Sequence, residues 1–238
     1  MKNLLTCEWR KLAFANYIIP PEIVEDLLPA HTKPDFFNGN CFVSLLGFQF
    51  KNIEVAGIKV PFYSDFEEIN LRFYVKRFDG ARWRKGTVFI SEIANKTALG
   101  LLANTLAREH YQILPTSQEI RETEDRLDVN YSWTSREQEQ FLRVISSKLI
   151  TPYEPHSETD FILDRMYGYG KIDEKTSNEY HISHSAWQTY EVLEYSINVD
   201  FAMQFGSPFS ILTSMTPHSV MLAEGSKVDI KGLQKIHS

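Results

Sequence analysis

Residues 66–75, FEEINLRFYV, are typical of a β-strand with two different faces, because apolar and polar side chains alternate along them. Successive strand side chains point to opposite sides of a sheet. One face is apolar and comprises Ile69, Leu71, Phe73 and Val75. The other is polar and comprises Glu68, Asn70, Arg72 and Tyr74. This mixed polar row favours the lining of a pocket, and a solvated sheet face is the alternative interpretation.

The polar row also makes a prediction about charge. At roughly 3.4 Å per residue, Glu68 and Arg72 lie about 13 Å apart along an extended strand and cannot pair directly. A guanidinium keeps its proton in proteins, so a buried Arg72 needs compensation. We therefore expect a carboxylate from another part of the chain to pair with Arg72.

Several other runs have the composition of strands, with many β-branched and aromatic residues between turn signals. They comprise residues 41–50, 87–94, 127–134, 139–149, 178–183, 190–199 and 218–230. Asp79-Gly80 predicts a hairpin between the runs 66–75 and 87–94. Tyr167-Gly168-Tyr169-Gly170 resembles a turn. We expect about nine strands, segregated from the helices rather than alternating with them, which indicates an α+β class.

Three or four short helices complete the predicted elements, and three of them have clear sequence signals. Pro20-Pro21 opens the first, Ser157 caps one over residues 157–166, and residues 95–109 carry an apolar stripe. That stripe consists of Leu99, Leu102 and Leu106. No linker separates two halves, so residues 1–238 are expected to form a single domain.

Composition narrows the possible partners. The 238 residues include 31 acidic and 25 basic side chains with no basic block, which argues against nucleic acid as a partner. No apolar run is long enough for a membrane helix or a signal-peptide core, so we expect a cytoplasmic protein. Cys7 and Cys41 are expected to be reduced, inert thiols. No GxGxxG or P-loop pattern occurs, and we expect no cofactor.

A family resemblance extends across most of the chain in a fixed order. The segments that carry it include Trp9, Phe14, residues 20–29 (PPEIVEDLLP), 66–75 (FEEINLRFYV), 87–95 (TVFISEIAN), 106–115 (LAREHYQILP), 161–169 (FILDRMYGY) and 184–187 (HSAW). Together they resemble the DUF2071, or YqjF-like, family, which is similar in fold to the acetoacetate decarboxylase superfamily. The resemblance implies a barrel-like or cone-shaped, mostly antiparallel sheet with a few flanking helices and an internal ligand cavity.

The family pattern also marks candidate site residues, whose roles in the family are not established. They are Glu68, Asn70, Arg72, Ser91, Arg108, Arg165, Tyr167, His184 and Trp187. Arg108 and Arg165 could instead cap helices or close structural salt bridges. His184 could be a general base or a core histidine bonded to backbone, and Tyr167 could rim a pocket or cover the sheet.

Two other kinds of site are not expected. In the decarboxylase branch the resemblance implies a Schiff-base lysine activated by an adjacent lysine, but this chain has no Lys-Lys pair. Lys96 begins the predicted helix and is expected to be exposed. His181 and His184, three residues apart on a strand, would point to opposite faces, so we expect no metal site.

Three functions are compatible with the sequence. The first is a small-molecule-binding protein for a small organic acid or aromatic compound, with Arg72 holding an anionic group. The second is an enzyme of the superfamily that uses acid/base residues such as Glu68 and His184 without a Schiff-base lysine. The third is a non-catalytic protein that forms homodimers through its strand edges.

Overall fold

The computed structural model describes residues 3–59, 65–95 and 111–237, and its described part is mostly β-structure. The strands are β1 (Asn3–Ile19), β2 (Lys33–Pro34), β3 (Cys41–Val55), β4 (Ile58–Lys59), β5 (Phe66–Phe78), β6 (Trp83–Ala94), β7 (Tyr111–Ile113), β8 (Thr116–Glu122), β9 (Arg126–Ser135), β10 (Gln138–Thr151), β11 (Tyr167–Lys171), β12 (Ser177–His184), β13 (Thr189–Asn198) and β14 (Ser219–Ile236). The helices described are α1 (Glu22–Glu25), α3 (Glu158–Leu163), α4 (Phe201–Phe205) and the 3₁₀ helix η1 (Ser207–Ser214).

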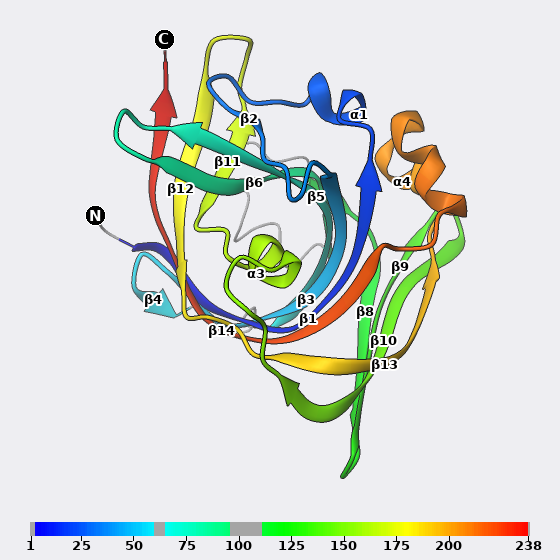
Figure 1. The fold of residues 1–238 in the computed structure, drawn as a ribbon. Helices are drawn as coiled ribbons and strands as arrows, with labels where there is room; N and C mark the ends of the chain where they lie inside the picture. The colour runs from blue at the N-terminus through cyan, green and yellow to red at the C-terminus, as the bar shows by residue number, and fades with distance from the viewer. Residues whose placement is uncertain (1–2, 60–64, 96–110, 238) are drawn as a thin grey trace.

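Seven of these strands close into a barrel. Their order is β1-β3-β5-β6-β11-β12-β14, and β14 pairs back onto β1 (Figure 1). The pairing is antiparallel except between β6 and β11, which run parallel. Strands β13, β10, β9 and β8 continue the same sheet beyond the barrel. The predicted barrel-like, mostly antiparallel sheet is confirmed.

Both faces of the strand β5 are buried, because each face packs in a different core. Its apolar face, which includes Ile69 and Leu71, packs in a core that also contains Tyr131 and Trp133 of β9. The opposite face points into the barrel, where a second core includes Trp9 and Tyr180. Burial of every residue from Phe66 to Val75 follows from this position between two cores.

Helix α3 lies within the ring of strands (Figure 1). Ser157 caps it as predicted, accepting a hydrogen bond at 3.2 Å from the backbone N–H of Asp160. The helix is shorter than expected because Asp164 leaves helical geometry, with φ −83° and ψ 70°. Phe161 packs its ring against Phe42 and Tyr74, at centroid distances of 6.0 and 5.3 Å. Apolar packing therefore fixes α3 inside the barrel.

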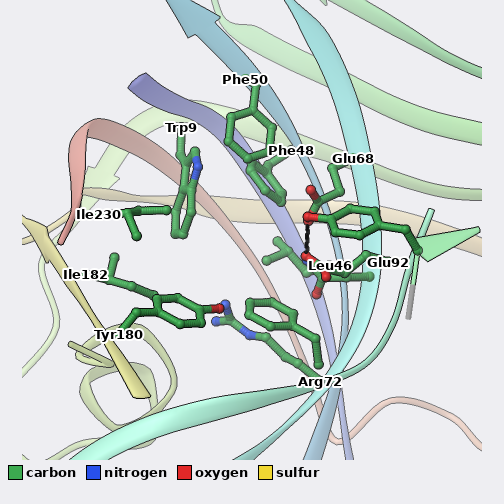
Figure 2. A pocket seen from close by; sticks show the side chains of 13 residues that line it. Trp9, Leu46, Phe48, Phe50, Glu68, Arg72, Glu92, Tyr180, Ile182 and Ile230 are labelled. Carbon is green, nitrogen blue, oxygen red and sulfur yellow. Dashed lines mark hydrogen bonds between the residues drawn. The ribbon is translucent and has the colours of Figure 1, made fainter. Parts of the chain in front are cut away.

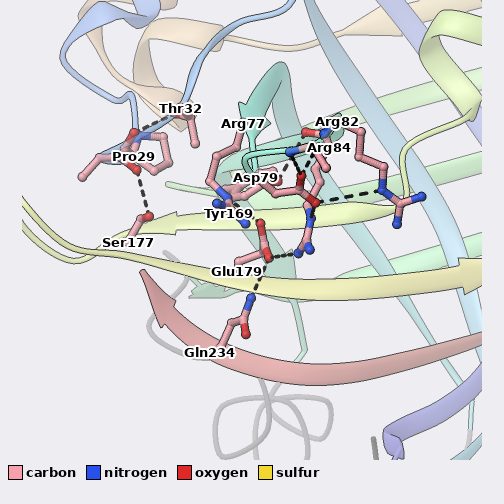
Figure 3. Close-up of polar contacts among 12 residues, drawn as sticks. Pro29, Thr32, Arg77, Asp79, Arg82, Arg84, Tyr169, Ser177, Glu179 and Gln234 are labelled. Carbon is pink, nitrogen blue, oxygen red and sulfur yellow. Dashed lines mark hydrogen bonds and ion pairs between the residues drawn. The ribbon is translucent and has the colours of Figure 1, made fainter. Parts of the chain in front are cut away.

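A polar network ties the β5–β6 hairpin to β12 and β14 (Figure 3). The carboxylate of Glu179 accepts hydrogen bonds from Arg77, Arg84 and Gln234 at 2.7, 2.6 and 2.8 Å. Arg84 also contacts Asp79 at 2.7 Å. Burial raises the pKa of Glu179, but hydrogen bonds from Arg77 and Tyr169 outweigh burial and leave the pKa below its usual value. The carboxylate therefore stays ionised.

Some of the predicted elements are present in the structure and others are not. The hairpin at Asp79-Gly80 and the helix after Pro20-Pro21 are confirmed, although that helix extends only over Glu22–Glu25. The expectation of about nine strands is wrong, since the described residues alone contain fourteen. The predicted helix over 95–109, with its leucine stripe, lies outside the described residues apart from Asn95.

The turn predicted at Tyr167-Gly168-Tyr169-Gly170 is also wrong, because these residues form strand β11. Its glycine allows close contact rather than a turn: a Cβ on Gly168 would lie 2.0 Å from Cζ of Tyr180. A Cβ on Gly86 would likewise lie 2.4 Å from the carbonyl oxygen of Tyr167 on the paired strand. Gly86 and Gly168 therefore allow β6, β11 and β12 to pack closely against one another.

No helix in the described ranges is long and apolar enough to cross a membrane.

Candidate functional site

A pocket lies inside the barrel, against the polar face of β5 (Figure 2). Its lining residues come from β1, β3, β5, β6, β7, β12 and β14, and they are Trp9, Leu46, Phe48, Phe50, Glu68, Asn70, Arg72, Phe89, Glu92, Tyr111, Tyr180, Ile182 and Ile230. Its free volume is about 20 Å³, little more than one water molecule needs. The pocket is thus small, mostly aromatic and aliphatic, and polar along one wall.

The strand register explains how the polar wall forms. Asn70 of β5 pairs with Leu46 of β3 on one side and with Glu92 of β6 on the other. The β5–β6 register shifts between Leu71 and Arg72, so that Phe89, three residues before Glu92, faces the same pocket. This bulge places an aromatic ring beside Arg72.

Two carboxylates belong to the polar wall. The amide nitrogen of Asn70 donates a hydrogen bond to Oε1 of Glu68 at 3.0 Å. The hydroxyl of Tyr111 donates to Oε1 of Glu92 at 3.0 Å. Glu68 and Glu92 are both 2% exposed. Each carboxylate is thereby oriented by a neutral hydrogen-bond donor.

Arg72 contributes the positive charge of the pocket, and it is 4% exposed. Its guanidinium lies over the rings of Phe14 and Tyr74, at 5.0 and 5.7 Å from their centroids. Nη2 donates a long hydrogen bond of 3.4 Å to the carbonyl of Ile162 in α3. Within the described ranges no carboxylate forms an ion pair with Arg72, and Nε has no hydrogen-bond partner.

The prediction that a carboxylate pairs with Arg72 is therefore wrong for the residues that the structure describes. Aromatic faces and a backbone carbonyl surround the guanidinium instead. These groups stabilise a cation only in part, because none of them carries a full negative charge.

The pocket contains a second buried polar atom without a hydrogen-bond partner among the described residues, Oδ1 of Asn70. The Asn70 side chain is 0% exposed. The bond from its amide nitrogen to Glu68 determines which end of the amide is oxygen, since a carboxylate accepts only from N–H. The pocket thus contains a buried acceptor near a buried donor.

Ser91 is buried but does not line the pocket. It neighbours Glu92 on β6, and adjacent strand residues point to opposite faces. Its hydroxyl accepts a hydrogen bond at 2.8 Å from the side-chain nitrogen of Gln112, which also donates to the carbonyl of Gln204 at 3.0 Å. Ser91 therefore belongs to a polar network on the opposite side of β6.

Arg165 follows α3 two residues after its last residue, is buried and paired, and is not part of the pocket wall. Its Nη1 is 2.7 Å from Oδ2 of Asp35, and its Nε donates to the carbonyl of Phe161 at 2.5 Å. Lys76 holds the other oxygen of Asp35 at 2.7 Å. Burial raises the pKa of Asp35, but Arg165 and Lys76 outweigh it and lower the pKa below its usual value.

His184 and Trp187 form a stacked pair next to the pocket rather than in its lining. Their rings are 4.2 Å apart and 20° from parallel. His184 Nδ1 lies 2.9 Å from the carbonyl of Ser185, and burial lowers the pKa of the imidazole below its usual value. Trp187 also contacts Trp9, a pocket residue, with ring centroids 6.2 Å apart. The geometry matches a histidine bonded to backbone.

Tyr167 lines a different hollow, at the surface. Its other lining residues are Arg82, Trp83, Lys85, Asp164, Met166 and His181, around a volume of about 240 Å³. Arg108 lies outside the described residues, as does Lys96. No group of three metal-ligating side chains occurs in the described ranges.

Sequence reasoning missed much of the pocket wall. The inward-facing aromatic residues of β1 and β3 include Trp9, Phe48 and Phe50. The sequence does contain a signal for the last two, because residues two apart on a strand share a face. Glu92 and Tyr111 meet through parallel pairing of β6 with β7, which sequence spacing does not reveal. The bulge that turns Phe89 inward was likewise not predictable.

Comparison with known proteins identifies the family. The model of DUF2071, described as an uncharacterized conserved protein, matches residues 6–227. A search of curated proteins found no significant match.

Solved structures share the fold at low identity. An acetoacetate decarboxylase-like enzyme from Sphingomonas wittichii RW1 has a TM-score of 0.64 and 13% identity, covering 100% of this chain and 95% of its own. Acetoacetate decarboxylase from Legionella pneumophila subsp. pneumophila str. Philadelphia 1 has a TM-score of 0.65 and 10% identity, covering 97% and 86%. The enduracididine biosynthesis enzyme MppR, complexed with pyruvate, has a TM-score of 0.60 and 11% identity, covering 99% and 91%. The protein belongs to the DUF2071 family and has an acetoacetate decarboxylase-like fold.

Proposed function

We propose that the protein binds a short organic acid in the barrel pocket and that Arg72 holds its carboxylate. The observation that carries this proposal is the buried guanidinium of Arg72, which lines the pocket and has no acidic partner among the described residues. Glu68 and Glu92 line the same pocket but form no ion pair with Arg72, so a carboxylate ligand would supply the direct ionic partner that the guanidinium lacks among the described residues. The fork of N–H groups on a guanidinium suits the two oxygens of a carboxylate.

The physical reason is the cost of an uncompensated buried charge. Moving an ion out of water costs several kcal/mol even after relaxation, and arginine does not avoid this cost by losing its proton. Proteins retain such destabilising groups mainly where function requires them. Nε of Arg72, which has no partner, is the atom that an entering anion would contact.

Pocket size favours an acid over an aromatic compound. The free volume of about 20 Å³ accommodates little more than one water, so only a short ligand enters without large movements of the aromatic walls. Acids of one to three carbons require the least rearrangement. A fold relative, MppR, is complexed with pyruvate, which is an acid of this size.

A second candidate function is acid/base catalysis at the same pocket. Glu68 and Glu92 lie on its polar wall, and Tyr111 donates a hydrogen bond to Glu92. A carboxylate that exchanges a proton beside an anion held by Arg72 could promote proton transfer on the bound acid. His184, the other candidate base, lies outside the pocket lining. No lysine from the described ranges lines the pocket.

Binding can be tested by the melting temperature and by titration calorimetry with formate, acetate, glycolate and pyruvate. We expect these acids to raise the melting temperature of the parent protein, because a ligand that binds only the native state stabilises it. Arg72→Met should abolish the shift. The matched control is Arg126→Met, since the Arg126 side chain is 55% exposed and far from the pocket in sequence and sheet order.

Equal shifts in the parent and in Arg72→Met, or no shift with any acid, would contradict the proposal. Incubation of the parent with acetoacetate and pyruvate, followed by product analysis, separates the two candidate functions. Turnover that Glu92→Gln abolishes would favour catalysis, whereas binding without turnover would favour a binding protein.

A further inference from the structure

We propose that the preferred acid carries a hydroxyl group and that this hydroxyl donates a hydrogen bond to Oδ1 of Asn70. This inference rests on the proposed function, because it assumes that Arg72 holds the carboxylate. It adds the chemical class of the ligand, a short hydroxy acid.

The side-chain amide of Asn70 has a defined orientation. Its nitrogen donates to Glu68 at 3.0 Å, so its oxygen points elsewhere. That oxygen is buried, lines the pocket through its side chain and has no partner among the described residues. A buried acceptor without a donor is destabilising, and water or a ligand donor removes the penalty.

The second step is the spacing of the two unsatisfied groups. Asn70 and Arg72 are two residues apart on the same face of β5, so their Cα atoms lie about 7 Å apart along an extended strand. Both side chains reach into one small pocket. A single short molecule can therefore contact both, with an anionic end at Arg72 and a donor within a few bonds of it.

The third step is the chemistry of the donor. Oδ1 only accepts hydrogen bonds, so a keto or ether oxygen on the ligand cannot satisfy it, while a hydroxyl can. An ammonium group would also donate and would face the carboxylates of Glu68 and Glu92, but it would have to leave water as a charged group, whereas a hydroxyl adds no charge to desolvate. The lining therefore favours a neutral hydroxyl.

The test compares matched acids on the intact parent protein by titration calorimetry. Glycolate is compared with methoxyacetate, which keeps the ether oxygen but cannot donate, and lactate is compared with pyruvate. Glycine serves as the ammonium probe. We expect glycolate and lactate to bind at least about tenfold more tightly than their partners, since an unpaired buried acceptor is costly. Glycine should bind more weakly than glycolate.

A variant then assigns the preference to Asn70. Asn70→Leu should reduce the affinity for glycolate to that for methoxyacetate, while Asn198→Leu, at an exposed position, should leave the ratio unchanged. The comparison on the parent protein remains decisive if Asn70→Leu does not fold. Acids that bind through Arg72 without any preference for the hydroxyl would overturn this inference and leave the proposed function intact. If no acid binds, the pocket holds water only, and both proposals fail.

Discussion

Replacement of Arg72 by methionine should increase the stability of the ligand-free protein, which is the opposite of what loss of a buried arginine usually causes. The guanidinium is 4% exposed, with aromatic rings at 5.0 and 5.7 Å and one hydrogen bond at the long distance of 3.4 Å. No carboxylate from the described residues forms an ion pair with it. Methionine has a similar length and no charge, so it can occupy much of the same space.

The magnitude follows from the opposing contributions. Desolvation of a buried ion costs several kcal/mol. The two cation–π contacts return about 0.5–2 kcal/mol each, and the long hydrogen bond about 0.5 kcal/mol. We expect Arg72→Met to raise the free energy of unfolding by about 1–3 kcal/mol.

The assay is equilibrium unfolding in urea, followed by circular dichroism, in a buffer free of carboxylate, phosphate and sulfonate. With a slope of about 3 kcal/mol/M, the midpoint should rise by about 0.3–1 M. Arg165→Met provides the contrast, because Arg165 is equally buried but pairs with Asp35 at 2.7 Å. This second variant should lower the free energy of unfolding by about 2–4 kcal/mol. The loss is limited because Lys76 still pairs with Asp35.

Opposite signs for the two arginine variants are the expected result. A loss of more than about 1 kcal/mol for Arg72→Met would refute the reasoning, because it would mean that a compensating partner stabilises the guanidinium. An equal loss for both variants would show that burial alone, rather than pairing, determines the effect.

Four further measurements test other parts of the structure. Burial lowers the pKa of His184 below 6.5, so the unfolded chain takes up a proton at a higher pH than the folded protein does. The free energy of unfolding should therefore decrease from pH 7 to pH 5, and it should decrease less steeply in His184→Gln than in the parent. Burial raises the pKa of Cys41 to about 11 and that of Cys7 further, so neither thiol should react with iodoacetamide at pH 8 until the protein unfolds. Gly168→Ala should lower the melting temperature by several degrees, because its Cβ would lie 2.0 Å from the ring of Tyr180. Borohydride added with pyruvate or acetoacetate should leave the intact mass unchanged, and an adduct on one lysine would reveal imine chemistry.

Local pattern was sufficient to predict the central strand and its polar row. The alternation in residues 66–75 predicted β5, and the polar row Glu68, Asn70 and Arg72 does line a pocket. Both faces are buried because the barrel lies on one side and the extension of the sheet on the other. Alternation within one strand cannot distinguish that position from a solvated face, since it says nothing about what covers either side.

Long-range pairing explains most of the remaining errors. The 17-residue strand β1 was not predicted, because its charged residues interrupt the apolar pattern. In the fold these charges find partners far along the chain, such as Lys11 with Glu224 at 2.5 Å. The strand β11 resembled a turn because it contains two glycines, one of which, Gly168, allows close contact with Tyr180 of β12. The partner of Arg165, residue Asp35, is 130 positions away.

The two buried arginines are connected through α3, and this connection relates the structural pair to the candidate site. The carbonyl of Phe161 accepts from Arg165, and the carbonyl of the next residue, Ile162, accepts from Arg72. The Asp35–Arg165 ion pair therefore helps to position the same turn of backbone that orients the guanidinium of Arg72. Its hydrogen bond at 3.4 Å is weak enough for an entering carboxylate to compete with it. Loss of the ion pair should then weaken acid binding through the position of α3, although Arg165 itself does not line the pocket.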